Sequence, residues 1–422
     1  MEKVITVGVQ RQGTDAGETH SSMEELARLV ETAGGQVVDT SIQKRDRPDP
    51  ATYLGKGKAE ELFKTARRLG VKTIVFDETL KPNQQRNLEE ATDTKVVDRT
   101  RLILDIFARR ARTSEGKLQV ELAQLSYLMP RLTERFGRFE QQVGGIGTRG
   151  PGERKLEVDR RRLRDRMAAL KTQLEKVRQE RALQRVVRRS IPIPQVALVG
   201  YTNAGKSTLL NALIDASSSA PKADRHKVYA DDKLFATLDP TTRRIRLPSG
   251  RIILFTDTVG FIRKLPTELV AAFRATLEET GTADLLVHVV DAADPAWEEQ
   301  MQAVAQILKD LRMDRLPVLA AYNKMDRLSP SKKRAFGTHG GCLLSAGTGA
   351  GIREFLRTVE DELSKQWTET EIFVPYTDHA RLALLHEHTE ILSQEPTERG
   401  IRFRLRSHPD TFAQIIHHQA VR

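Results

Sequence analysis

The sequence has one cysteine and no long apolar run, and each scarcity excludes a class of protein. With Cys342 alone, the chain forms no internal disulfide and offers no CxxC framework for zinc, so we expect Cys342 to be a buried thiol. No stretch approaches the roughly 18 apolar residues that a membrane span needs. The opening MEKVITVGVQ lacks the apolar core and small-residue cleavage site of a signal peptide. We therefore expect a cytoplasmic protein without a membrane span.

The length and composition fit a soluble protein of several domains. The 422 residues allow about two to four domains at roughly 100 to 200 residues each. Hydrophobic residues make up 39% and charged residues 30%, as is typical of globular proteins. The sequence shows no internal repeat and no low-complexity tract. No apolar patch or strand edge can be identified, so a monomer is the default expectation.

Positive charge is concentrated in one segment. The net charge is +11, yet residues 99–189 alone hold 24 Lys or Arg against 11 Asp or Glu. Within this segment lies a run of five closely spaced arginines, namely Arg160, Arg161, Arg162, Arg164 and Arg166. Guanidinium groups bind phosphate oxygens in a forked geometry, which makes RNA a natural partner. The alternative is a solvated helix face on which Glu157, Asp159 and Asp165 pair with the arginines.

The pattern of strands and helices predicts an α/β multidomain protein with four parts. Residues 1–98 alternate β-like runs with amphipathic segments and predict a small α/β domain with a mainly parallel sheet. In that domain Ser22 and Glu25 predict a capping box at the start of a helix, and Gly34 and Gly70 are expected to close helices. Residues 99–190 form a basic helical arm, residues 191–366 a second alternating α/β domain that carries the motifs described below, and residues 367–422 a small C-terminal α/β domain.

The basic arm is predicted to be two long helices joined by a glycine loop. The first runs from Arg99 to about Met129 and ends before Pro130. The second carries apolar residues at a coiled-coil spacing, namely Leu156, Leu163, Met167, Leu170, Leu174 and Val177. Between them, GGIGTRGPGER (144–154) is either a flexible connector or a tip that enters an RNA cavity. Six residues are the candidate RNA contacts: Arg149, Arg154, Lys155, Arg160, Arg161 and Arg162.

A phosphate-binding motif follows an apolar strand. GYTNAGKS, residues 200–207, matches GxxxxGK[ST] and lies between the strand VALVG and a helical segment. Its glycines let backbone amides surround a phosphate, Lys206 bridges the β and γ oxygens, and Ser207 holds Mg2+. The sequence therefore predicts a nucleotide site that uses Mg2+.

Further motifs complete the site and select the base. Asp257 ends a strand, where it contacts Mg2+ through water, and the Gly260 amide senses the γ-phosphate. Asp326 accepts two hydrogen bonds from guanine, whereas adenine would leave the carboxylate unpaired. In FATLDPTTR we favour Thr237 over Thr241 or Thr242 as the second Mg2+ ligand.

The expected roles divide as follows. The catalytic residues are Lys206, Thr237 and Gly260, and the metal residues are Ser207, Thr237 and Asp257. The nucleotide-binding residues are Gly200, Tyr201, Thr202, Asn203, Ala204, Gly205, Lys206, Ser207, Thr208, Phe235, Ala236, Thr237, Leu238, Asp239, Asp257, Thr258, Val259, Gly260, Asn323, Lys324, Asp326, Ser345 and Ala346.

These motifs, with YLGKGKAEEL, DRTRLILDIFARRA and GGIGTRGPGERKLE upstream, closely resemble the HflX family of ribosome-associated P-loop GTPases. The match covers nearly the whole chain and weakens over the last fifty residues. The resemblance implies binding of GTP and GDP with Mg2+, association with the large (50S) ribosomal subunit and its rRNA, and splitting or rescue of stalled or idle ribosomes, especially under heat stress. It also places residues 132–155 towards the peptidyl-transferase region.

Phe261 follows Gly260 where Ras-like sites have a glutamine that orients water. We therefore expect slow intrinsic hydrolysis that the ribosome stimulates. Two other functions stay open: a ribosome assembly factor and a non-ribosomal RNA-binding GTPase. GKGK (55–58) lacks the spacing of a second phosphate-binding motif, so a helix entry with exposed lysines is favoured over an RNA phosphate contact. The histidines of the last segment, His386, His388, His417 and His418, lack a metal framework and are expected at the surface.

Overall fold

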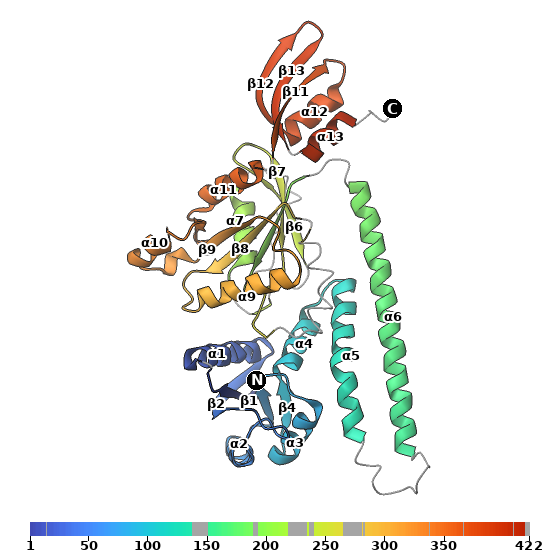
Figure 1. Ribbon diagram of the computed structural model, residues 1–422, viewed down its shortest axis with the longest axis vertical. Coiled ribbons are helices and arrows are strands. Elements are labelled where there is room, and N and C mark those ends of the chain that lie inside the picture. Colours follow the sequence, from blue (N-terminus) through green and yellow to red (C-terminus); the bar gives the residue numbers. More distant parts are fainter. Residues whose placement is uncertain are drawn as a thin grey trace. The chain divides into compact units, whose positions relative to one another are not determined.

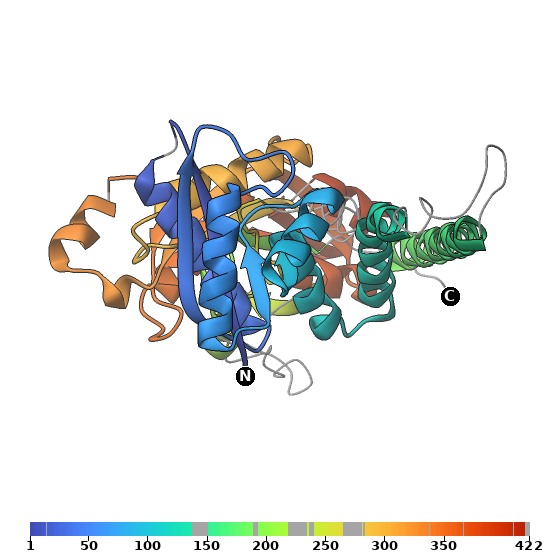
Figure 2. The ribbon, with the colours of Figure 1, turned by 90° about the horizontal axis from the view of Figure 1, so that it is seen from below.

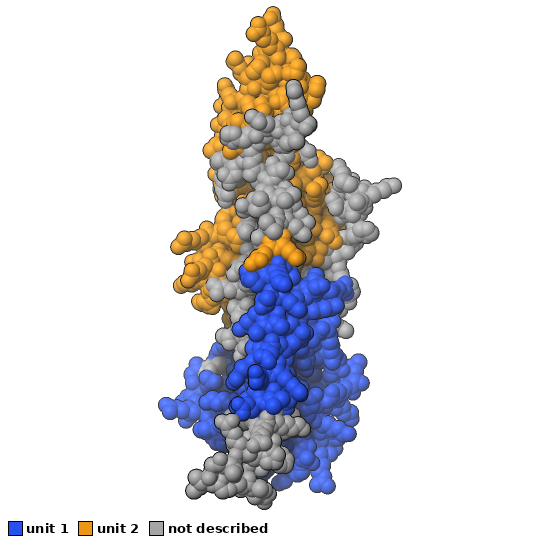
Figure 3. Space-filling view, turned by 90° about the vertical axis from the view of Figure 1, so that its right-hand side faces the viewer, with its two compact units in different colours: residues 1–177, 233–238, 263–274 blue, residues 178–232, 239–262, 275–422 orange. Residues whose placement is uncertain are grey.

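The computed structural model describes residues 1–13, 15–136, 151–188, 193–217, 234–235, 240–264, 281, 283–336, 338–365, 367–407 and 409–417. These residues form two compact units, which Figure 3 colours separately. The first contains the described residues of 1–177 together with 234–235 and 263–264. The second contains those of 178–217, 240–262 and 281–417.

The first unit is built on a four-stranded parallel sheet, as the sequence predicts. The strands are β1 (Glu2–Arg11), β2 (Gly35–Arg45), β3 (Thr73–Phe76) and β4 (Lys95–Asp98), in the order β2-β1-β3-β4. Helices cover both of its faces (Figures 1 and 2): α1 (Ala16–Thr32), α2 (Lys56–Leu69), α3 (Pro82–Thr92) and α4 (Arg99–Arg110). Apolar residues of β1, β3 and β4 are buried, as is typical of strands covered on both sides, whereas those of β2 are only partly buried.

The start of α1 differs from the prediction. The helix begins at Ala16, so Ser22 and Glu25 lie in its interior and form no capping box. Their side chains instead make tertiary contacts, Ser22 with Asp77 at 2.6 Å and Glu25 with Arg99 at 2.7 Å. The same residue types suit a capping box and a buried polar contact. Here Ser22 and Glu25 bind Asp77, which follows β3, and Arg99 of α4. Gly70 does close α2 in the left-handed conformation, with φ 65°.

The single helix expected over 99–129 is two helices. Helix α4 ends at Arg110, and α5 (Ser114–Phe136) begins after Thr113, whose hydroxyl accepts a hydrogen bond from the amide of Gly116 at 3.0 Å. Helix α5 continues through Pro130. Beyond the proline, Arg131 bonds Asp98 at 3.0 Å and the Leu80 carbonyl at 2.7 Å. These tertiary bonds hold the helix past a residue that by itself favours its end.

Helix α6 (Pro151–Arg188) lies beside α5 over its first-unit residues (Figures 1 and 2). Leu170 and Leu174 of the predicted apolar series are buried. Arg166 forms a forked ion pair with Glu121 of α5, with distances of 2.7 and 3.0 Å. The residues 137–150, with most of the predicted glycine loop, lie outside the described residues.

The second unit contains a six-stranded mixed sheet in the order β10-β9-β8-β5-β7-β6. Its strands are β5 (Gln195–Gly200), β6 (Thr241–Arg246), β7 (Ile252–Asp257), β8 (Leu285–Asp291), β9 (Val318–Asn323) and β10 (Cys342–Leu343). Only the β6–β7 pair is antiparallel among these described strands. The accompanying helices are α7 (Lys206–Ala216), α9 (Trp297–Asp310), the 3-10 turn η3 (Met325–Arg327), α10 (Pro330–Phe336) and α11 (Ile352–Ser364). The expected doubly wound nucleotide-binding architecture is confirmed.

Cys342 is half-buried rather than fully buried. It lies on β10 and packs against the core of the six-stranded sheet. Burial raises the pKa of its thiol above the ordinary value, which disfavours the reactive thiolate. The expected burial of this thiol is therefore only partial.

The C-terminal part is a three-stranded antiparallel sheet with two helices. Strands β11 (Thr368–Pro375) and β12 (Glu390–Thr397) flank β13 (Gly400–Ser407), and α12 (His379–His388) and α13 (Pro409–His417) complete it. Helix α12 ends at His388, because residues 390–397 form a strand that pairs with β13. Sequence reasoning missed this edge strand, since the pairing depends on a distant partner.

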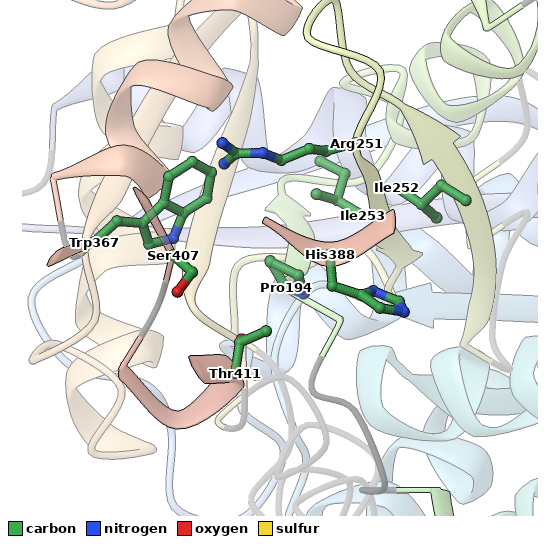
Figure 4. Close-up of a pocket in the computed structure, with 8 residues that line it drawn as sticks. All are labelled: Pro194, Arg251, Ile252, Ile253, Trp367, His388, Ser407 and Thr411. Carbon is green, nitrogen blue, oxygen red and sulfur yellow. The ribbon is translucent and has the colours of Figure 1, made fainter. Parts of the chain in front are cut away.

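One arginine of the nucleotide-binding part contacts the C-terminal part. The Arg251 guanidinium lies 3.9 Å from the centre of the Trp367 ring and 3.0 Å from a carboxylate oxygen of Glu390. Figure 4 shows a small cavity that Arg251 and Trp367 line together with Ser407 and Thr411. This stacked and paired arginine holds β12 against the start of β7.

Candidate functional site

The phosphate-binding loop connects β5 to α7 and requires glycine at both of its ends. At Gly200, with φ 149°, a Cβ atom would lie 2.2 Å from the Val289 carbonyl oxygen. At Gly205, with φ 93°, it would lie 2.3 Å from Nδ2 of Asn323. Neither the space nor the backbone conformation accepts another residue. The loop is thus tightly shaped by its neighbours, with α7 beginning directly after it.

Lys206 is the buried cation of this loop. Its side-chain nitrogen donates hydrogen bonds to the carbonyls of Gly200 at 3.0 Å and Tyr201 at 2.9 Å. Burial lowers its pKa to about 8, and the negative charge of Asp257 opposes that shift. An anionic ligand near the amine would restore the charged form, so the residue suits phosphate binding.

A hydroxyl and a carboxylate meet beside Lys206. The Ser207 hydroxyl donates a hydrogen bond to Asp257 at 2.6 Å. Asp257 ends β7, which pairs with β5, and the two strand ends therefore reach the same edge of the sheet. Hydroxyl and carboxylate oxygens are the ligand types that Mg2+ prefers. The two residues fit the predicted metal role.

The segment after Asp257 is fixed to the phosphate-binding loop. The amide of Phe261 donates to the Gly200 carbonyl at 3.0 Å, and the Thr202 amide donates to the Phe261 carbonyl at 2.8 Å. A Cβ atom on Gly260 would lie 2.8 Å from Cα of Thr202 and 3.1 Å from the Lys206 amine. Gly260 therefore lies so close to the loop that a larger residue there would meet Thr202. The Phe261 side chain is buried.

Asn323 joins two loops of the predicted base-binding region. Its Nδ2 donates to the Ala204 carbonyl at 2.9 Å, and its Oδ1 accepts from the Ala346 amide at 2.9 Å. Asp326 accepts a hydrogen bond from the Ser345 hydroxyl at 2.6 Å, which is the main reason that its pKa lies below the usual range. The carboxylate stays charged, as recognition of guanine requires.

Lys324 has a partner that sequence reasoning missed. Its amine donates to the Asn203 carbonyl at 2.8 Å and pairs with Asp291 at 2.7 Å. Asp291 ends β8, next to β9, so its position at a strand end was the available signal. The role of Ser345 was also incomplete, because its hydroxyl orients Asp326.

The structure does not describe every predicted site residue. Ala236, Thr237, Leu238, Asp239 and Arg149 lie outside the described residues, as do the side chains of Arg154 and Lys155. The alternatives Thr241 and Thr242 lie at the start of β6. The Thr242 hydroxyl forms a hydrogen bond of 2.9 Å with the Thr256 hydroxyl on the neighbouring strand β7.

Most of the remaining predicted residues lie in the phosphate-binding loop, at strand ends or on α6, whereas Phe235 packs against Phe107 of α4. Tyr201, Thr202, Asn203, Ala204 and Thr208 belong to the phosphate-binding loop and first turn of α7, and Thr258 and Val259 follow β7. Phe235 is buried, and Arg160, Arg161 and Arg162 lie on α6.

The helix entry predicted at GKGK (55–58) agrees with the structure. GKGK forms the entry of α2, where Lys58 pairs with Glu61 at 2.8 Å. Over the part of the chain that the structure describes, no group of three His, Cys, Asp or Glu residues could hold a metal ion. The same residues include no helix that is long and apolar enough to cross a bilayer.

Three sequence families match the chain in succession. Residues 20–108 match the family described as GTP-binding GTPase N-terminal, and residues 110–188 match GTP-binding GTPase Middle Region. Residues 195–324 match the family described as 50S ribosome-binding GTPase. The last match ends just after Asn323 and so contains the phosphate-binding loop and the Asp257 segment.

Relatives called GTPase HflX align over most of the chain. The protein of Lacrimispora saccharolytica is 46% identical over 401 residues, which are 95% of this chain and 92% of the relative. That of Escherichia coli K12 is 44% identical over 357 residues, 84% of this chain and 82% of the relative. A GTP-binding protein of Sulfolobus solfataricus, solved with GDP, is 23% identical, with TM-score 0.44 over 86% of this chain and 99% of that one. With relatives above 40% identity over most of its length, the chain belongs to the HflX family of GTPases and hydrolyses GTP.

Proposed function

We propose that this GTPase associates with the large ribosomal subunit and splits or rescues stalled or idle ribosomes under stress, with its basic helical arm contacting rRNA. The supporting observation is the row of exposed arginines on α6 of the chain that carries the guanine-nucleotide site. Arg161, Arg162 and Arg164 are all exposed on this helix. The family description of residues 195–324 names the 50S ribosome as the partner of those proteins.

The pairing of the α6 arginines favours an external partner over an internally neutralised face. Arg166 is bound by Glu121, but Arg162 is 77% exposed and its closest described pair, with Asp159, is 3.8 Å long. An exposed pair of that length contributes little, at most roughly 1 kcal/mol. The guanidinium group therefore stays available for phosphate oxygens, which bind it through two hydrogen bonds.

Each predicted site residue has a role in GTP hydrolysis under this proposal. Lys206 would hold the β and γ oxygens, Ser207 would hold Mg2+ directly and Asp257 through water, and the Gly260 amide would contact the γ-phosphate. Bound Mg2+ neutralises charge on the phosphates. Asp326 would recognise guanine, and the Ser345 hydroxyl orients the Asp326 carboxylate. Thr237 keeps its predicted role as the second metal ligand.

The buried Phe261 gives a reason for ribosome dependence. A phenyl group neither donates nor accepts the hydrogen bond that orients attacking water, so the free protein should hydrolyse GTP slowly. Docking on the ribosome would order the segments around Thr237 and Gly260 and raise turnover. Ordering of these segments depends on the γ-phosphate. The GTP-bound protein would therefore dock on the ribosome, and the GDP-bound protein would leave it.

Sucrose-gradient sedimentation with a non-hydrolysable GTP analogue tests the proposal. The triple variant Arg161→Ala, Arg162→Ala, Arg164→Ala should lose comigration with the large subunit at moderate salt while GTP affinity stays unchanged. For every phosphate that an arginine no longer neutralises, the slope of log affinity against log salt should fall by about 1. A matched control removes the exposed Arg353 and Arg357 of α11.

Failure of the parent protein to comigrate with the large subunit in any nucleotide state would refute the ribosomal assignment. Comigration without subunit separation, together with precursor accumulation in a deletion strain, would instead identify an assembly factor. A triple variant that binds and splits ribosomes like the parent would remove α6 from the interface.

A further inference from the structure

One fully buried carboxylate joins the arm helix α5 to the N-terminal sheet. Asp98 ends β4 and accepts hydrogen bonds from the Leu80 amide at 3.0 Å and the Arg101 amide at 2.8 Å. Two further donors come from α5, namely the Tyr127 hydroxyl at 2.9 Å and the Arg131 guanidinium at 3.0 Å. Each carboxylate oxygen therefore has one backbone donor and one donor from α5. We call Asp98, Tyr127 and Arg131 the Asp98 cluster.

The two α5 residues of the Asp98 cluster are bound to the N-terminal domain at several points. Tyr127 is buried, and burial raises the pKa of its hydroxyl, so the hydroxyl keeps the proton that it donates. The Arg131 guanidinium lies 3.5 Å from the centre of the Tyr127 ring. It also donates to the Leu80 carbonyl at 2.7 Å and to Gln85 of α3 at 3.2 Å. Arg131 thus contacts the end of β4, the loop before α3, and α3.

The Asp98 carboxylate needs both α5 donors. Burial raises the pKa of Asp98, and its hydrogen bonds and the positive charge of Arg131 oppose that rise. Removal of one donor leaves a buried carboxylate oxygen less compensated, which is costly. Tyr127 and Arg131 therefore hold α5 against the sheet with directional bonds. The apolar contacts of α5, which include the buried Val120 and Ala123, have no such directional preference.

The Asp98 cluster lies on both sides of the weakest point of α5. Pro130 is inside this helix, where a proline removes a backbone hydrogen bond and favours a bend. Tyr127 precedes the proline and Arg131 follows it, yet both bind the same carboxylate. Helix α5 ends at Phe136, about 7.5 Å of helix beyond Arg131. Asp98 therefore fixes the direction in which α5 leads towards the predicted glycine loop.

We propose that Asp98, Tyr127 and Arg131 are positioning residues for RNA binding, which fix the end of α5 from which the chain enters the glycine loop. The ligand is a phosphate-rich RNA surface, and this role rests on the proposed function, which identifies that surface as rRNA. The physical reason is preorganisation, because an arm that is already held in one direction loses less conformational entropy on binding. None of the three residues belongs to a nucleotide motif.

Hydrogen exchange on the free full-length protein tests whether the Asp98 cluster holds α5. In Arg131→Met, the backbone amides of residues 126–136 should exchange more than about threefold faster than in the parent, while those of β1 keep their rate. Arg166→Met is the matched control, because Arg166 also forms a forked bond, to Glu121 of α5, but at an exposed site. Exchange at 126–136 within about threefold of the parent, or an equal acceleration in β1, would overturn the proposal.

Binding to isolated large ribosomal subunits tests the consequence, with a non-hydrolysable GTP analogue and well below the unfolding temperature. Tyr127→Phe changes no charge and removes only a buried hydroxyl, so it removes no phosphate contact. This variant and Arg131→Met should each bind more than about threefold more weakly, with GTP affinity unchanged. Lys365→Met removes the same charge as Arg131→Met from an exposed pair with Glu362, and it should bind like the parent.

The two experiments separate this role from the ribosomal function. If the parent does not bind the large subunit, the ribosomal function is refuted, and exchange in the free protein still decides whether Asp98 holds α5. If the parent binds and Tyr127→Phe binds within about threefold of it, the ribosomal function stands and the positioning role is refuted.

Discussion

The structure makes Asn323 the residue whose truncation should most directly loosen the nucleotide site. Its amide donates to the Ala204 carbonyl and accepts from the Ala346 amide, both at 2.9 Å, and the residue is 2% exposed. Asn323→Ala removes both bonds and leaves two buried backbone groups without this partner. Each such group costs roughly 1–3 kcal/mol, so the sum is about 2–6 kcal/mol.

This cost should appear in nucleotide affinity. The loops containing Ala204 and Ala346 can recover hydrogen bonds with water only by leaving the arrangement that binds the nucleotide. If the binding arrangement becomes a minor population, the apparent dissociation constant rises in proportion. A cost of about 2 kcal/mol corresponds to a dissociation constant for GDP about 30-fold higher. We expect at least that change.

Fluorescence titration with a labelled GDP measures the effect, and circular dichroism checks the fold. Asn87→Ala is the matched control, because Asn87 also donates to a carbonyl, that of Ala51, at 2.9 Å, but at an exposed site. It should change neither affinity nor stability by more than about 0.5 kcal/mol. A folded Asn323→Ala protein that binds GDP within threefold of the parent would refute the reasoning.

Three further predictions concern the same site. Asp326→Asn should weaken GTP binding at least about 100-fold and favour xanthosine nucleotides, because an amide donates where the carboxylate accepts; competition titrations measure this. Since burial lowers the Lys206 pKa to about 8, the amine loses its proton as pH rises through that value, and phosphate binding should restore it. Calorimetry in buffers of different ionisation enthalpy should then detect more proton uptake on nucleotide binding at pH 8.5 than at pH 7. Gly205→Ala should abolish nucleotide binding, whereas Gly57→Ala, where an added Cβ meets nothing within 4 Å, should not.

Motifs with local chemistry were readable from the sequence. The phosphate-binding loop, the strand-end carboxylate Asp257 and the base-recognition residue Asp326 all lie where the sequence places them. Their positions follow from short-range rules, since a loop between a strand and a helix has few conformations and parallel strands end at one edge. The parallel N-terminal sheet was predictable for the same reason.

Contacts between distant residues were not readable. The pattern of Ser22 and Glu25 suits a helix cap, yet Asp77 and Arg99 bind both side chains. Likewise, tertiary bonds of Arg131 carry α5 past Pro130, and pairing with β13 turns residues 390–397 into a strand.

The amino-acid order alone determined the nucleotide chemistry and the family, because each motif works through neighbours in the chain. Only the tertiary structure decided that Lys264 meets Asp77 across 187 positions of sequence. Ion pairs between buried groups depend on which elements the fold brings together, and no local pattern encodes that choice.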